Sequence, residues 1–276
     1  MRAGDGNNDI DVGGGDNQVY AGRGSDDVTA GGGDDRIEVG DGNNTVSAGD
    51  GDNRVVTGRD SDRIAAGRGD DTILAGGGDN RVAAGSGDNY VSAGSGRDTI
   101  SGGSGDDTVY AGDGSNRVSA GNGDNLVSAG SGSDTIAAGR GDDTVRAGDG
   151  NNDIDVGGGD NQVYAGRGSD DVTAGGGDDR IEVGDGNNTV SAGDGDNRVV
   201  TGRDSDRIAA GRGDDTILAG GGDNRVAAGR GDNYVSAGSG RDTISGGSGD
   251  DTVYAGDGNN TVSAGDGDNL VSAVGL

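Results

Sequence analysis

The sequence predicts an all-β solenoid, in which short strands from successive repeats stack on one another. A β-branched residue recurs every nine positions from Ile10 to Val271, which gives 30 repeats without a slip in register. The second position of the repeat A-G-x-G-x-[N/D]-x-[V/I]-x is Gly in all 30. Only 28% of residues are hydrophobic and the net charge is −29, a composition typical of disorder. The strict period overrides that reading and indicates a repeat fold.

The Gly-rich half of each repeat is expected to form a loop. Gly at positions two and four allows the backbone to adopt positive φ and brings carbonyl oxygens close together. The last three residues are expected to form a short strand, with the central Val or Ile on one face and its neighbours on the other. One buried aliphatic residue per strand makes a thin core, which becomes stable only when many repeats stack.

This repeat resembles the RTX (repeats-in-toxin) nonapeptide G-G-x-G-x-D-x-U-x, and the resemblance covers almost the whole chain. It implies a right-handed parallel β-roll, a β-solenoid with two nonapeptides per turn and about 15 turns. We expect a single continuous roll over residues 3–273 and an irregular tail at 274–276. Residues 3–146 and 147–273 are near-identical copies, and residues 3–129 recur as 147–273 with four substitutions. Such fidelity indicates either a recent duplication or a synthetic gene.

The resemblance also implies calcium ions between consecutive loops, bound by carbonyl oxygens and by the Asp at position six. Aspartate occupies that position in 14 repeats. The candidate metal ligands are therefore Asp26, Asp35, Asp62, Asp71, Asp98, Asp107, Asp134, Asp143, Asp170, Asp179, Asp206, Asp215, Asp242 and Asp251.

The other 16 repeats depart from the family pattern, because they carry Asn at position six. The order along the chain is Asn-Asn-Asp-Asp, so each edge of a roll with two repeats per turn alternates Asn with Asp. In one reading, multiple Ca²⁺ ions bind with fewer charged ligands, and half occupancy, 14 ions, nearly balances the charge of −29. In the other reading no metal is needed, because each Asn donates its NH₂ to the carboxylate in the next turn.

The two outer faces of the predicted roll differ in composition. All six tyrosines lie on the face formed by the even-numbered repeats, at Tyr20, Tyr90, Tyr110, Tyr164, Tyr234 and Tyr254. Aliphatic residues join them at Val56, Leu74 and Leu126, and at Val200, Leu218 and Leu270 in the second copy. We expect an apolar stripe that serves self-association or adhesion, and the uncapped ends of the roll offer a second route to self-association.

Other functions find little support in the sequence. A net charge of −29 disfavours nucleic acid and anionic membranes as partners. The absence of His, Cys and Lys disfavours catalysis, and no small-molecule substrate is indicated. Because Met1 and Arg2 lead directly into the repeats, we expect no N-terminal signal peptide. The resemblance then implies an extracellular protein exported without an N-terminal signal. Asp60 and Asp204 replace the Gly at position four, which indicates either a distorted loop or an altered ion site, and we favour the distorted loop.

Overall fold

The structure is a computed structural model that describes residues 1–273, so the predicted tail at 274–276 lies outside the described residues. All regular elements in the described part of the chain are β-strands, as predicted, and no helix occurs there. The chain divides into two units, Met1–Gly139 and Arg140–Leu276, and each is described by itself. Among residues 1–273, no helix has the length and apolarity needed to cross a membrane.

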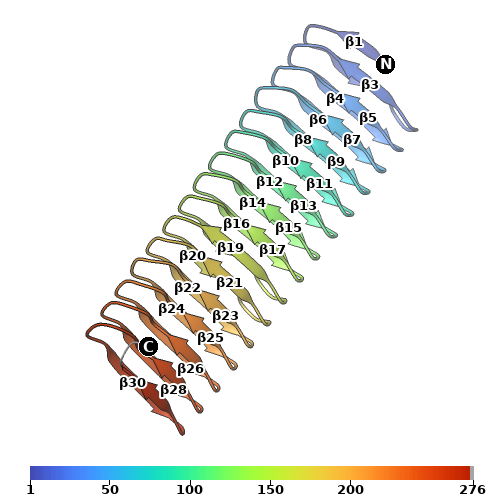
Figure 1. Ribbon diagram of the computed structural model, residues 1–276. Coiled ribbons are helices and arrows are strands. Elements are labelled where there is room, and N and C mark those ends of the chain that lie inside the picture. Colours follow the sequence, from blue (N-terminus) through green and yellow to red (C-terminus); the bar gives the residue numbers. More distant parts are fainter. Residues whose placement is uncertain (274–276) are drawn as a thin grey trace. The chain divides into compact units, whose positions relative to one another are not determined.

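The strands of the first unit form two parallel sheets through which the chain passes alternately (Figure 1). One sheet consists of β1 (Arg2–Gly4), β3 (Gln18–Ala21), β5 (Arg36–Glu38), β7 (Arg54–Val56), β9 (Thr72–Leu74), β11 (Tyr90–Ser92), β13 (Thr108–Tyr110) and β15 (Leu126–Ser128). The other consists of β2 (Asp9–Asp11), β4 (Asp27–Gly32), β6 (Thr45–Asp50), β8 (Arg63–Arg68), β10 (Arg81–Ser86), β12 (Thr99–Ser104) and β14 (Arg117–Asn122). The next strand, β16 (Thr135–Arg140), ends at the first residue of the second unit.

The second unit has the same construction. Its odd-numbered strands are β17 (Thr144–Arg146), β19 (Gln162–Gly166), β21 (Arg180–Val183), β23 (Arg198–Val200), β25 (Thr216–Leu218), β27 (Tyr234–Ser236), β29 (Thr252–Tyr254) and β31 (Leu270–Ser272). Its even-numbered strands are β18 (Asp153–Asp155), β20 (Asp171–Thr173), β22 (Thr189–Asp194), β24 (Arg207–Arg212), β26 (Arg225–Arg230), β28 (Thr243–Ser248) and β30 (Thr261–Asp266).

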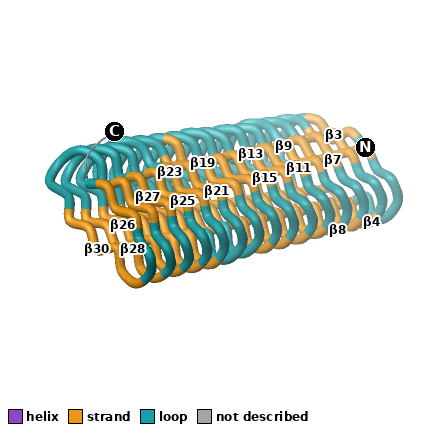
Figure 2. The backbone as a smooth tube through the Cα atoms, turned by 60° about the horizontal axis from the view of Figure 1, so that its bottom comes forward, coloured by secondary structure: helices purple, strands orange, loops and turns teal. Residues whose placement is uncertain are grey.

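The register of strand pairing confirms two nonapeptides per turn. Val82 of β10 pairs with Ile100 of β12, and Val91 of β11 pairs with Val109 of β13, so each residue meets its equivalent 18 positions later. The result is a β-solenoid of about 15 turns. Most even-numbered strands are longer than the predicted triplet and continue through positions one to three of the next repeat, as in Arg63–Arg68. The loops that join the two sheets gather along two edges of each unit (Figure 2).

Two rows of small and aliphatic side chains fill the space between the sheets. The Val or Ile at position eight is fully buried from Ile10 to Val253, and so is the Ala at position one in most repeats. Both rows point inward because the side chains at positions eight and one lie two residues apart on the same face of a strand. The predicted thin core is therefore observed, with the alanines as a second component.

Glycine is required where successive loops lie against each other. Gly85 has a φ of +116°, and a Cβ there would lie 1.8 Å from the carbonyl oxygen of Gly67 in the preceding turn. By contrast, a Cβ at Gly77, at position three, would meet nothing closer than 3.6 Å. The close approach of loop backbones at positions two and four explains why Gly is retained there, and it stacks the position-six residues directly above one another.

Candidate metal centre

The position-six side chains lie at the end of each loop, immediately before the strand, and they point into the seam between successive turns. All 14 aspartates predicted as metal ligands are buried, with at most 2% of their surface exposed. Within each unit they form two rows, one along each loop edge, in which Asp and Asn alternate from turn to turn. The alternation predicted from the sequence is therefore a physical stack.

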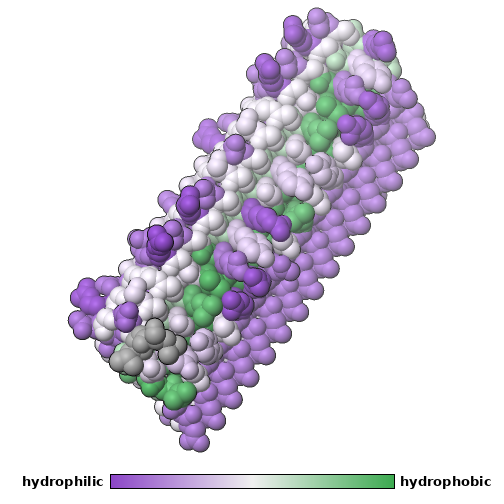
Figure 3. All heavy atoms as spheres, in the orientation of Figure 1, coloured by the Kyte–Doolittle hydropathy of each residue, from purple (hydrophilic) through white to green (hydrophobic). Residues whose placement is uncertain are grey.

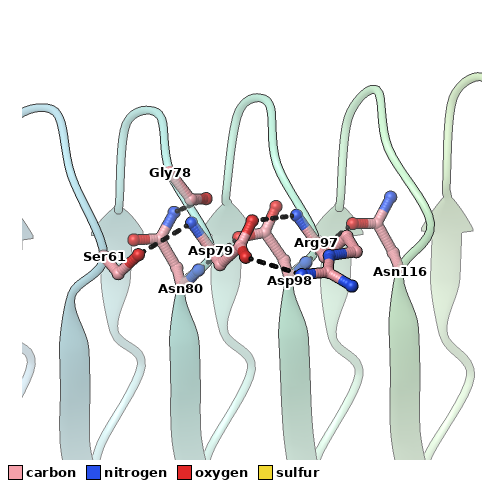
Figure 4. Close-up of polar contacts among 7 residues, drawn as sticks. All are labelled: Ser61, Gly78, Asp79, Asn80, Arg97, Asp98 and Asn116. Atoms are coloured by element: carbon pink, nitrogen blue, oxygen red, sulfur yellow. Dashed lines mark hydrogen bonds and ion pairs between the residues drawn. The ribbon is translucent and has the colours of Figure 1, made fainter.

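A continuous hydrogen-bond ladder joins the members of a row. The backbone N–H of Asn80 donates to Oδ1 of Asp98 over 2.7 Å, and the backbone N–H of Asp98 donates to Oδ1 of Asn116 over 3.0 Å (Figure 4). The same bond recurs from Asn44 to Asp62 over 2.8 Å and from Asp62 to Asn80 over 3.0 Å. Asp and Asn therefore play the same part through Oδ1, and both tie each turn to the preceding one.

The Asn side chains use their remaining atoms as donors. The Nδ2 group of Asn44 donates to the carbonyl oxygens of Gly40 and Gly42 in its own loop, over 3.0 and 2.8 Å. In at least six pairs Nδ2 also donates to Oδ1 of the Asp in the next turn, as from Asn89 to Asp107 over 2.9 Å. The Asn–Asp ladder expected from the sequence is thus confirmed, with the loop carbonyls as further acceptors that the sequence did not reveal.

The Asp side chains leave one oxygen without a partner. Oδ2 is buried and accepts no hydrogen bond in each of the 14 aspartates of the described chain. The position of Gly102 shows which atoms lie near this oxygen. A Cβ added to Gly102 would lie 2.4 Å from Oδ2 of Asp107 and 2.6 Å from the carbonyl oxygen of Ala120, so these two oxygens lie near each other. A buried carboxylate oxygen that faces other acceptors is costly unless a proton or a cation joins them.

Burial also affects how readily these groups ionise. Desolvation raises the pKa of Asp71, Asp98, Asp179 and Asp215 to about 6, although hydrogen bonds donated by the neighbouring Asn act in the opposite direction. The cause is the loss of hydration of the charged form. The hydrogen bonds that Oδ1 accepts offset this loss only in part, because Oδ2 accepts none. The seam therefore favours a bound positive charge, either a proton or a metal ion.

A second row of carboxylates lies outside the seam. Position five of every even-numbered repeat is Asp. Along this row, an exposed carboxylate accepts the backbone N–H of the equivalent Asp in the next turn. Examples are the bonds from Asp70 to Asp52 over 2.8 Å and from Asp88 to Asp70 over 2.7 Å. These side chains point toward the following turn and into solvent, whereas the position-six side chains point into the protein.

The donor set of the seam fits a hard cation. In residues 1–273 no group of three or more His, Cys, Asp or Glu side chains is arranged to hold a metal ion. A cation beside Oδ2 would therefore draw its other ligands from backbone carbonyls and water. Calcium accepts six to eight such oxygen ligands in flexible geometry, whereas zinc and the later transition metals prefer nitrogen and sulfur. The unpartnered Oδ2 atoms and the adjacent carbonyls are thus compatible with Ca²⁺.

The aspartates at position four show a local conformation that sequence reasoning did not resolve. Asp60 and Asp204 have φ values of 84° and 83°, the only positive φ angles of non-glycine residues in the described chain. They therefore adopt the left-handed backbone of the glycines that they replace, at a cost of about 1–3 kcal/mol each. The hydrogen bonds from Gly42 to the carbonyl of Arg59 and from Gly186 to that of Arg203 measure 3.2 and 3.3 Å, against 2.7 Å from Gly51 to Arg68, so the loop is locally distorted, as predicted.

Comparison with protein families gave matches along almost the whole chain. A family described as "RTX calcium-binding nonapeptide repeat (4 copies)" matches twelve overlapping or adjoining segments, at residues 2–37, 29–64, 56–91, 84–118, 92–127, 110–145, 128–163, 146–181, 164–199, 173–208, 200–235 and 236–271. Comparison with curated proteins found no match.

Proposed function

Because the chain belongs to the family of RTX calcium-binding nonapeptide repeats, we propose that it is a structural β-roll that binds Ca²⁺ between its loops and is stabilised by it. The observation that carries this proposal is the row of buried Oδ2 atoms without partners at Asp26, Asp35 and their equivalents. A protein that buries 14 carboxylates with one free oxygen each gains most from a ligand that supplies positive charge there.

The chain's own residues would hold the ion and transmit its effect. The Asp carboxylate at position six would provide Oδ2, while its Oδ1 keeps the bond to the backbone N–H of the preceding turn. A cation on Oδ2 would neutralise the carboxylate and so remove the main penalty for stacking that turn. Since a preformed site does not exist in an unfolded chain, binding would contribute directly to the free energy of folding.

The family and the site together suggest a structural role. RTX repeats occur typically in secreted proteins, and we extend that to an extracellular location for this chain. Millimolar Ca²⁺ outside cells would then fill weak sites that are empty inside. We propose no catalytic activity, because the seam carboxylates are committed to backbone hydrogen bonds and the remaining acids lie on loops or on the outer face of strands, as Asp9 and Glu38 do.

Circular dichroism during a metal titration tests this function. The chain would be stripped with EGTA, and its far-UV spectrum and thermal midpoint recorded as Ca²⁺ is added, with Mg²⁺ as the control ion. We expect Ca²⁺ to increase β-structure or raise the midpoint by 10 °C or more, and Mg²⁺ to do far less, because it dehydrates reluctantly. An identical melting curve in EGTA and in excess Ca²⁺ would refute the proposal.

A second function, lateral self-association, is favoured by the aromatic pairs on the odd-numbered strands. The rings of Tyr90 and Tyr110 lie 5.7 Å apart and remain about 40% exposed, and Tyr234 and Tyr254 form the equivalent pair at 5.6 Å. Figure 3 shows a band of apolar side chains bordered by a hydrophilic edge. From β3 to β31 the outward positions carry five Arg, two Glu and no Asp, so this face is free of the acidic excess found elsewhere.

Sedimentation velocity over a wide concentration range would test this association. We expect the wild-type chain to sediment faster as concentration rises, and the variant with Tyr90→Thr, Tyr110→Thr, Tyr234→Thr and Tyr254→Thr to stay monomeric. Arg81→Thr on the opposite sheet is the control and should leave association unchanged. A wild-type chain that remains monomeric at all concentrations would contradict this function.

A further inference from the structure

The two residue types at position six place different atoms in the same part of the seam. In each of the 16 Asn repeats, Nδ2 donates to at least one glycine carbonyl of its own loop, as from Asn53 to Gly51 over 2.8 Å and from Asn188 to Gly186 over 2.9 Å. In the 14 Asp repeats the corresponding atom is Oδ2, which carries no hydrogen to donate and accepts no hydrogen bond. An amide N–H therefore fills, in alternate turns, the place where a carboxylate oxygen is unpartnered.

The carbonyl of position one in the next turn supports this correspondence. The Nδ2 group of Asn80 donates to the carbonyl oxygen of Ala93, 13 residues later, over 3.2 Å. Oδ2 of Asp107 and the carbonyl oxygen of Ala120, which is also 13 residues later, both lie next to Gly102. Asp251 and Ala264 repeat the arrangement at Gly246. This carbonyl therefore accepts an amide hydrogen beside Asn80, whereas beside Asp107 and Asp251 it faces a bare carboxylate oxygen. The turns of Asp62 and Asp206 differ, because there the carbonyl accepts the hydroxyl of Thr57 or Thr201 over 2.7 Å.

The Asn turns are also poor places for a cation. The amide oxygen of Asn116 accepts the backbone N–H of Asp98 over 3.0 Å, so it already serves the ladder (Figure 4). Its Nδ2 donates to the carbonyl oxygens of Gly112 and Gly114 over 2.9 and 3.2 Å. A cation on those carbonyls would have to displace both hydrogen bonds and would meet partial positive charge on the NH₂ group.

We propose that only the Asp turns take a cation, and that the Asn amide replaces the cation in the alternate turns. The chain would then bind about 14 Ca²⁺ ions, one per position-six aspartate, rather than about 30. This inference rests on the proposed calcium-binding function and adds which loops bind. Each cation-dependent turn would lie between two turns that need no metal, as Asp62 lies between Asn44 and Asn80.

Counting bound ions tests the inference. The EGTA-stripped chain would be dialysed to equilibrium against excess Ca²⁺ with matched buffer, and the metal measured by mass spectrometry alongside protein concentration. Calorimetric titration provides an independent stoichiometry. We expect about 14 ions for the wild type. Asn80→Asp with Asn89→Asp should raise the number by two, and Asp98→Asn with Asp107→Asn should lower it by two while the metal-free roll melts at a higher temperature.

The control removes two charges from exposed sites. Asp50 and Asp194 pair with Arg68 and Arg212 on the surface, so Asp50→Asn with Asp194→Asn should leave the stoichiometry unchanged. If the Asn→Asp variant fails to fold, the Asp→Asn variant still decides the matter. A wild-type value near 30, or a value unmoved by the position-six changes, would overturn this inference and leave the proposed function intact. No bound Ca²⁺ at all would overturn both.

Discussion

The stability of the metal-free roll should fall as pH rises through the range in which the buried aspartates ionise. In Asp71, Asp98, Asp179 and Asp215, burial raises the pKa to about 6. An unfolded chain returns each carboxyl to its ordinary value of about 3.9. Between these two values the folded state binds more protons than the unfolded state, so the free energy of unfolding must decrease as pH increases.

The magnitude follows from the size of the pKa difference. A difference of about two pH units corresponds to roughly 3 kcal/mol for one group. That contribution is present in full below about pH 4 and is lost as pH rises through 6, because the ionised carboxylate then has a buried Oδ2 without a partner. Even two such groups in one unit, Asp71 and Asp98, would account for a large part of the stability of an ordinary domain.

Urea denaturation followed by circular dichroism measures this effect. Unfolding would be recorded in EGTA between pH 4 and pH 8, and again with saturating Ca²⁺. We expect the midpoint in EGTA to be highest near pH 4–5 and to fall steadily up to about pH 7. With Ca²⁺ the midpoint should stay high at neutral pH, because the cation takes the place of the proton.

Charge repulsion across the whole acidic chain has the same sign, and a variant separates the two effects. Asp71→Asn with Asp98→Asn should make the fall of the midpoint with pH in EGTA less steep, because an amide is neutral at every pH and donates to the loop carbonyls, while Asp179 and Asp215 still titrate. Asp50→Asn with Asp194→Asn removes the same charge from the surface and should leave the slope nearly unchanged. A midpoint in EGTA that is constant or rises between pH 4 and pH 7 would refute the reasoning.

Three further predictions concern the backbone and the core. Gly85→Ala should destabilise the roll by about 3 kcal/mol or more in urea denaturation, because of positive φ and the contact with Gly67, whereas Gly77→Ala should change stability by less than about 0.5 kcal/mol. Asp60→Gly should raise the free energy of unfolding by about 1 kcal/mol, and an unchanged or lower value would show that its positive φ is not strained. Ile100→Val should cost about 0.5–1.5 kcal/mol, and a thermal midpoint equal to that of the wild type would contradict its place in the core.

Most of the fold could be predicted from the sequence because a single period encodes every element. Val82 and Ile100 lie 18 residues apart in the sequence and pair in the structure, as two nonapeptides per turn require. The extension of strands such as Arg63–Arg68 through Ala66 and Gly67 could not be predicted. The sequence of a Gly-rich segment does not reveal whether its backbone joins the sheet ladder, since that depends on the close approach of the next turn.

The candidate site was predictable in its residues but not in its hydrogen bonding. Periodicity identifies position six, and all 14 aspartates there are buried in the seam. It does not reveal that Oδ1 of Asp98 is already bonded to the preceding turn while Oδ2 has no partner. Nor does it reveal that Asn44 donates to Gly40 and Gly42. These features depend on side-chain rotation within a stack, which a one-dimensional pattern does not encode.

The two readings of the Asn–Asp alternation describe one seam and do not exclude each other. Carboxylates in adjacent turns would lie about 4.8 Å apart and repel by roughly 3 kcal/mol at an effective dielectric constant of 20. Alternation with Asn doubles the spacing and about halves that energy, and Asn89 donates to the carboxylate of Asp107 in addition. The ladder therefore lowers the electrostatic cost of folding without metal. The unpartnered Oδ2 of each Asp still allows a cation to stabilise the roll further. An all-Asp seam would lose the first property, and an all-Asn seam would lose the second.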